Sequence, residues 1–164
     1  MASPLASSTP TLRPDRLALL GPRDDSWRRQ FNVGSVAGLG AFCADASVVS
    51  GAPVQTAAAA VRFVASDGWW LHVDVDVLDP VAFPAQGLPD VPDEPGGLTI
   101  DQLRAALKAA TGSGGCVGMS VAIYDPDQDP DGACAHTVVD FIADALQSRV
   151  CGSRSRTVCN CSDL

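Results

Sequence analysis

WWLHVDVDVLDP, residues 69–80, is the most informative segment of the sequence. Residues 69–75 form a continuous apolar run with few polar interruptions, which is the pattern of a strand covered on both faces. Asp74 and Asp76 lie two residues apart at the end of this run, so their side chains project to the same side of the strand. The stretch therefore predicts a buried strand that ends in a pair of carboxylates.

Predicted helices and strands alternate on both sides of this stretch. Pro53 suits the first turn of a helix, and the alanines after it give residues 53–66 a high helix propensity. Thr99 and Gln102 have the spacing of a capping box, which begins a helix that runs to about Ala110. The remaining expectations are strands over residues 16–21, 47–50 and 116–123, a loop or short helix over 23–32, helical spacing over 33–44 and an amphipathic helix over 133–148. This alternation predicts an α/β fold, a three-layer αβα architecture with a mostly parallel sheet.

Length and local composition divide the chain into three parts. A chain of 164 residues suits one domain and is long enough to bury a core. Residues 1–15 are rich in Ser, Thr and Pro and predict a flexible lead-in, and residues 16–148 are the predicted α/β domain. After Ser148 the sequence turns polar and basic without apolar periodicity, so residues 149–164 predict a disordered tail. A frame-shifted or read-through end is one hypothesis for this tail.

Composition and charge exclude several classes of partner. Hydrophobic residues make up 46% of the chain and charged residues 18%, a globular rather than a disordered composition. The net charge of -8, without a face rich in Lys or Arg, argues against nucleic acid and anionic membranes as partners. No apolar run is long enough to span a membrane, and the N-terminal residues lack the pattern of a secretory signal. The expected location is therefore the cytoplasm.

The six cysteines predict neither a disulfide framework nor a zinc site. Cys43, Cys116 and Cys134 lie singly in apolar surroundings, where cysteine behaves as a small core residue. The other three crowd into the last stretch of the chain without the paired spacing of zinc ligands. Neither a metal site in the tail nor a disulfide framework is therefore expected.

The carboxylate pair at positions 74 and 76 has two interpretations. Ligands of open α/β sheets gather beyond the carboxyl ends of the strands, which is where Asp74 and Asp76 are expected. Two carboxylates that converge there repel one another unless a cation lies between them, and such oxygen ligands suit manganese or magnesium. The alternative is that both side chains only accept hydrogen bonds from backbone amides of the following loop.

Residues 74–80, DVDVLDP, resemble the Asp-x-Asp-x-x-Asp-Pro signature of the arginase, agmatinase and formimidoylglutamase family, the ureohydrolases. Three flanking features extend the resemblance: the apolar strand before the signature, the proline-rich loop that ends in PGGLT (95–99) with the helix after it, and the strand and loop GMSVAIYDP (118–126). RLALLGPRD (16–24) also resembles an earlier strand of the family that ends in a Gly-x-Arg-Asp turn. The similarity covers residues 16–147 and corresponds to the C-terminal part of the family.

The resemblance implies hydrolysis of a guanidine or amidine carbon–nitrogen bond by a hydroxide that bridges two manganese ions. It implies that Asp74 bridges both ions and that Asp76 binds one of them. Asp79 matches the third aspartate of the signature and is expected to organise the loop rather than to bind metal. His72 shares the face of Asp74 and could approach the site, but a structural role in the strand is expected. The implied partners are a small guanidino or amidino substrate and other copies of the chain.

The sequence also departs from the family pattern. The Gly-Gly-Asp-His turn and the Asp-Ala-His-x-Asp strand end, which supply further metal ligands in the family, do not occur in it. Ile123 stands where the family commonly has a glutamate that binds the guanidinium group of the substrate. The aspartates of the following loop could bind a cation, although a solvated acidic loop is the preferred interpretation (Asp125, Asp127, Asp129 and Asp131). The substrate-binding residues and the catalytic residues are therefore not identified.

Three functional hypotheses remain. The first is a truncated ureohydrolase that is inactive alone and needs the missing ligands from another chain. The second is a non-catalytic, degenerate relative or assembly partner. The third is a haloacid-dehalogenase-like phosphatase, in which Asp74 would be the nucleophile, although the residues after Asp76 and the placement of lysine do not fit that class.

Overall fold

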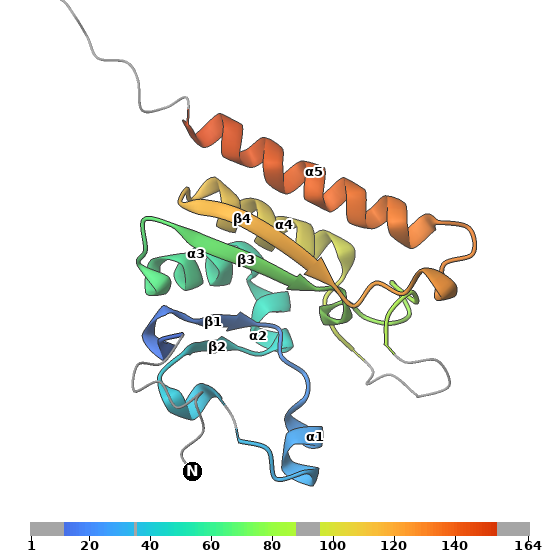
Figure 1. Cartoon of the computed structure of the whole chain (residues 1–164), viewed down its shortest axis with the longest axis horizontal. Helices are drawn as coiled ribbons and strands as arrows, with labels where there is room; N and C mark the ends of the chain where they lie inside the picture. Colours follow the sequence, from blue (N-terminus) through green and yellow to red (C-terminus); the bar gives the residue numbers. More distant parts are fainter. Residues whose placement is uncertain (1–11, 35, 88–95, 154–164) are drawn as a thin grey trace, which may run out of the picture.

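The computed structural model describes residues 12–34, 36–87 and 96–153 (Figure 1). The strands in this part of the chain are β1 (Ala18–Leu20), β2 (Phe42–Ala44), β3 (Trp69–Asp74) and β4 (Cys116–Ala122). The α-helices are α1 (Asp25–Gln30), α2 (Ala46–Gly51), α3 (Pro53–Val64), α4 (Ile100–Gly112) and α5 (Ala133–Ser153). Short 3-10 helices are η1 (Pro14–Arg16), η2 (Val36–Leu39), η3 (Val75–Val77) and η4 (Pro126–Gln128).

The strands form two parallel pairs. β1 pairs with β2, with Leu19 opposite Cys43, and β3 pairs with β4, with Val73 opposite Val121. Figure 1 places β1 on the side of β3 that faces away from β4. Within the described ranges, β1 and β3 are not joined in one ladder, so the strands make two two-stranded sheets. The predicted α/β class with parallel strands is confirmed.

Helices α3, α4 and α5 pack side by side and bury the core against the strands. Leu107 of α4 and Phe141 of α5 join Val73 of β3 in the main hydrophobic cluster, and Phe141 is completely buried. Ala57 of α3 packs with Ala106 of α4 in a second cluster, where small side chains let the two helices approach closely. Burial of one large apolar side chain stabilises a fold by about 2–3 kcal/mol, so the helix layer holds the strands mainly through apolar contact.

Within the part of the chain that the structure describes, β3 is covered on one face only. Val73 is buried at 4% exposure and Leu71 is half-buried on the face that meets the helices. Trp70 is 61% exposed on the opposite face, where His72 and Asp74 are exposed as well. The prediction that residues 69–75 are covered on both faces is therefore wrong, because side chains alternate along a strand and the described helices pack against one of its sides.

Two predictions of secondary structure and one of burial are also wrong. Residues 47–50 lie in helix α2 instead of a strand, because the carboxylate of Asp45 accepts a hydrogen bond from the backbone N–H of Val48 (2.9 Å) and caps a helix there. Residues 33–44 contain η2 and strand β2 instead of a longer helix. The prediction that Cys43 is a small core residue is wrong, since Cys43 on β2 is exposed, whereas Cys116 and Cys134 are buried as predicted.

The stronger local signals are confirmed. α3 begins at Pro53, and Thr99 and Gln102 form the predicted capping box at the start of α4. α5 begins at Ala133 as predicted and continues past Ser148 to Ser153. Residues 154–164 of the predicted tail and residues 1–11 of the predicted lead-in lie outside the described residues. No described helix combines the length and hydropathy that a membrane span requires.

The acidic loop before α5 is not uniformly solvated. Asp129 is buried, and its carboxylate accepts hydrogen bonds from the backbone N–H groups of Cys134 (3.1 Å) and Ala135 (2.8 Å). The hydroxyl of Tyr124 donates a third hydrogen bond to it (2.9 Å). The solvated interpretation is therefore wrong for Asp129, which anchors the first turn of α5.

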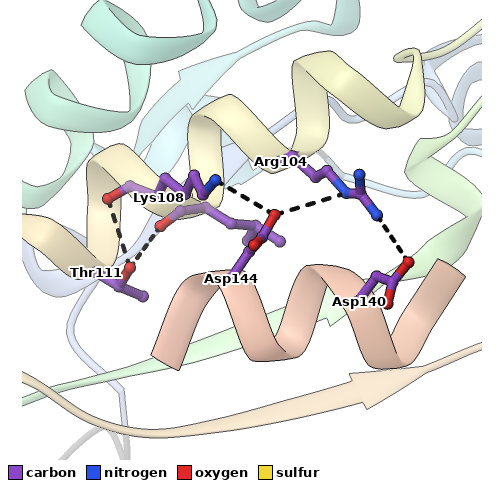
Figure 2. A network of polar contacts seen from close by, with 6 residues as sticks. Arg104, Lys108, Thr111, Asp140 and Asp144 are labelled. Atoms are coloured by element: carbon purple, nitrogen blue, oxygen red, sulfur yellow. Dashed lines mark hydrogen bonds and ion pairs between the residues drawn. The ribbon is translucent and has the colours of Figure 1, made fainter. Parts of the chain in front are cut away.

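Ion pairs lie along the α4–α5 contact (Figure 2). Asp144 Oδ2 is 3.3 Å from Lys108 Nζ and 3.9 Å from Arg104 Nε. Asp140 Oδ2 is 3.4 Å from Arg104 Nη2. These side chains are partly exposed, so each pair is expected to contribute at most about 1 kcal/mol.

Apolar packing rather than these ion pairs is expected to dominate stability. Phe141→Ala should lower the free energy of unfolding by about 3–5 kcal/mol, because it leaves a cavity in the main hydrophobic cluster. Lys108→Ala, the matched change in the ion-pair network, should cost less than about 1 kcal/mol. Urea unfolding followed by far-UV circular dichroism measures both, and equal losses would contradict this ranking.

Asp129 should make stability depend on pH. Burial acts to raise the pKa of Asp129, but the N–H groups of Ala135 and Cys134 and the Tyr124 hydroxyl outweigh it, and the net shift is downward. A depressed pKa stabilises the fold above the unfolded-state value of about 3.9, and this contribution is lost as the pH falls through the folded-state value. Asp129→Asn should therefore lower the urea midpoint at neutral pH and change it much less near pH 3, whereas Asp127→Asn should be nearly neutral at both. A loss for Asp129→Asn that does not depend on pH would contradict the role of its charge.

Candidate metal-binding site

The two predicted ligands lie at the carboxyl end of β3. Asp74 is the last residue of the strand, and Asp76 lies in η3 directly after it. Val75 between them is completely buried, which anchors the turn and leaves both carboxylates exposed. Partial burial raises the pKa of Asp76, the Asp74 carboxylate raises it further, and Arg23 acts in the opposite direction. The two carboxylates are therefore close enough to repel one another, a repulsion that a bound cation would relieve.

His72 lies beside Asp74 on the exposed face of β3. Its Nε2 is 3.1 Å from Asp74 Oδ1, and its Nδ1 is 2.7 Å from Ser120 Oγ on β4. Both ring nitrogens therefore have hydrogen-bond partners within the protein. The strand periodicity placed His72 next to Asp74 correctly, but it could not show the contact with Ser120, which depends on the pairing of β3 with β4.

Asp79 is engaged in the loop after the signature. Its Oδ1 accepts a hydrogen bond from the backbone N–H of Val81 (2.8 Å), and its own N–H donates to the carbonyl of Leu98 (3.0 Å). Gly97 has a φ of 131°, and a Cβ at this position would lie 2.7 Å from the backbone nitrogen of Asp79. The signature and residues 97–98 therefore pack backbone against backbone.

Arg23 connects the segments that carry the resemblance. Its guanidinium donates hydrogen bonds to the backbone carbonyls of Asp76 and Gly96, and it lies 3.4 Å from the carbonyl oxygen of Leu78. The GPRD turn after β1 is thereby tied both to the signature and to the segment before α4. Sequence reasoning used Arg23 only as part of the resemblance, because contacts to backbone carbonyls leave no signal in the residues contacted.

Ile123 follows β4, beside the strand that ends in the two carboxylates. It is 46% exposed and has a φ of 68°, in the left-handed region that β-branched residues rarely adopt. Ala122 is the register partner of Asp74, so Ile123 stands one residue beyond the tip of the paired strands. An exposed apolar side chain therefore stands in strained backbone where the resemblance implies a glutamate.

The residues present do not complete a metal centre. Within residues 12–34, 36–87 and 96–153, no group of three or more His, Cys, Asp or Glu side chains is placed to hold a metal ion. Two carboxylates are fewer ligands than a divalent cation takes from a protein, and both nitrogens of His72 are already engaged. The donor set has the right chemistry for manganese at two positions and falls short of a two-metal cluster.

Several solved structures share this fold. The arginase of Helicobacter pylori is 17% identical, with a TM-score of 0.69 over 84% of this chain and 45% of that chain. The proclavaminate amidino hydrolase of Streptomyces clavuligerus is 25% identical, with a TM-score of 0.67 over 84% of this chain and 43% of that chain. A hypothetical agmatinase from Burkholderia thailandensis is 23% identical, with a TM-score of 0.66 over 87% and 41%. This chain therefore spans less than half the length of the proteins it resembles.

Sequence comparison agrees with the structural one. No curated protein matches the chain. A family model described as "Arginase family" matches residues 1–147, which include β1 to β4, the signature and most of α5. The chain therefore belongs to the arginase family.

Proposed function

We propose that this chain contributes the Asp74–Asp76 part of a manganese-dependent site that hydrolyses a carbon–nitrogen bond of guanidino or amidino compounds, and that it is inactive alone. The observation that carries the proposal is the placement of two exposed carboxylates at the tip of β3, Asp74 as the last residue of the strand and Asp76 in the turn directly after it. The names of the similar structures, which include arginase, agmatinase and amidino hydrolase, support the substrate class. A cytoplasmic location and assembly with further chains belong to the same proposal.

Each residue of the site has a part in this proposal. Asp74 and Asp76 bind manganese, and the Arg23 contacts hold the loop that carries Asp76. Asp79 shapes the loop through its hydrogen bond to Val81 and stays off the metal. The further ligands and the group that recognises the substrate come from outside the described residues, because the described residues provide no third ligand. No catalytic step is assigned to this chain alone.

A non-catalytic relative is the second candidate. The strained, apolar Ile123 favours it, because an isoleucine cannot pair with a guanidinium group as a carboxylate does. The phosphatase hypothesis has less support. The only lysine of the sequence, Lys108, lies on α4 and pairs with Asp144 of α5 (Figure 2). Phosphatase activity that is independent of manganese and lost on Asp74→Asn would revive it.

Metal binding should be weak and incomplete in the isolated chain. Titration with MnCl2, followed by the electron paramagnetic resonance signal of free Mn2+, should show fewer than two ions per chain. Asp74→Asn and Asp76→Asn should each weaken this binding at least about tenfold, because each removes an anionic ligand. Asp101→Asn, on the exposed first turn of α4, is the matched control and should bind as the unchanged chain does. Two tightly bound ions per chain would overturn the conclusion that the site is incomplete.

Activity should appear on complementation. The chain should be mixed with a polypeptide that carries the Gly-Gly-Asp-His and Asp-Ala-His-x-Asp motifs. The mixture should release urea or ammonia from guanidino or amidino compounds only with Mn2+, and Asp74→Ala should abolish the release while Asp101→Asn retains it. If the two chains co-sediment but release nothing across a panel of such compounds, the non-catalytic candidate is favoured instead.

A further inference from the structure

The exposed face of the β3–β4 pair carries a line of polar side chains that the metal ligands do not account for. Trp70 and His72 alternate with Leu71 and Val73 along β3, and their register partners on β4 are Gly118 and Ser120. All four therefore lie on one face of the sheet, in line with Asp74. The Nε1 of Trp70 donates a hydrogen bond to Ser120 Oγ (3.0 Å), and Ser120 Oγ contacts His72 Nδ1 (2.7 Å). The line ends at Asp74 Oδ1, 3.1 Å from His72 Nε2.

The donors in this line have one consistent arrangement when the imidazole is neutral. The indole of Trp70 can only donate, so Ser120 Oγ accepts from it. An ionised Asp74 can only accept, so His72 Nε2 must carry the imidazole proton. Nδ1 is then unprotonated and accepts the hydroxyl proton of Ser120. Every donor points along the strand toward the carboxylate of Asp74.

Two small residues of β4 leave room for this line of side chains. A Cβ at Gly118 would overlap the ring of Trp70, so only glycine lets the indole lie against the sheet and aim its N–H at Ser120. Ala122, the register partner of Asp74, is also small. Among the described residues, no hydrogen bond reaches Asp74 Oδ2, so the line occupies one oxygen of the carboxylate and leaves the other for a cation.

We propose that Trp70, Ser120 and His72 are positioning residues that fix the carboxylate of Asp74 for metal binding. The inference rests on the proposed function for the role of Asp74, but the hydrogen-bond line itself does not depend on a metal. The same side chains also have the connectivity of a serine hydrolase, Ser to His to Asp. That alternative has less support, because Ser120 Oγ is already engaged by Trp70 on the flat face of a sheet.

The imidazole tautomer tests the line without metal. The chain has two histidines, which should be distinguished in long-range 15N–1H spectra of the full chain recorded at pH 8. His72 should be protonated at Nε2. His136 is the internal control, because its Nδ1 lies 2.7 Å from the carbonyl of Gly132 and must carry the proton there. In Ser120→Ala the His72 tautomers should become mixed and the Trp70 indole resonance should move, while Ser120→Thr should restore both.

Mn2+ binding tests whether these hydrogen bonds affect Asp74 as a metal ligand. Ser120→Ala and His72→Ala should weaken Mn2+ binding by about tenfold or more, and Ser120→Thr should recover it. If the unchanged chain binds no Mn2+ at all, the proposed function fails. The tautomer of His72 still tests whether the hydrogen bonds from Trp70 through Ser120 and His72 to Asp74 exist. His72 protonated at Nδ1, or Ser120→Ala with unchanged tautomer and unchanged Mn2+ binding, would overturn the inference. Hydrolysis of p-nitrophenyl acetate that disappears in Ser120→Ala would replace it with the serine hydrolase alternative.

Discussion

The guanidinium of Arg23 is the contact on which the arrangement of the site depends. Carbonyl groups of irregular segments need donors, and Arg23 supplies them to the signature loop and to the segment before α4 at once. The planar guanidinium carries five N–H donors in a fixed geometry, so one side chain can hold several carbonyls in a defined relation. Segments that are far apart in the sequence thereby meet where β1 and β3 end.

The charge of Arg23 matters as much as its hydrogen bonds. Two neighbouring carboxylates disfavour one another in the ionised form, and the positive charge of Arg23 offsets part of this effect on Asp76. The site can therefore keep its carboxylates together before a cation arrives. The hydrogen bond from Arg23 to the backbone carbonyl of Asp76 also fixes the turn next to that carboxylate.

Sequence reasoning succeeded where structure is determined locally. The Pro53 start of α3, the Thr99–Gln102 box of α4 and the strand before the signature follow from neighbouring residues, and all are present. β2 was missed because a three-residue strand owes its conformation to pairing with β1, which no local pattern encodes. The exposed face of β3 was missed for a related reason, since the run of apolar residues does not reveal which faces the helices cover. Arg23 and Ser120 reach their partners only through the fold, so their contributions needed coordinates.

Strand β3 has both an unpaired edge and an incomplete set of metal ligands at its end. Among the described residues, β3 pairs only with β4, so the backbone groups on its other side have no strand partner, and the same strand ends in two carboxylates without a third ligand. An unpaired strand edge favours association with another strand. A segment that pairs with this edge in parallel would bring its own carboxyl end beside Asp74 and Asp76, because the ends of parallel strands meet at one edge of a sheet. One added segment could then complete the hydrogen bonding of β3 and the coordination of a metal, which gives complementation a structural basis in the strand itself.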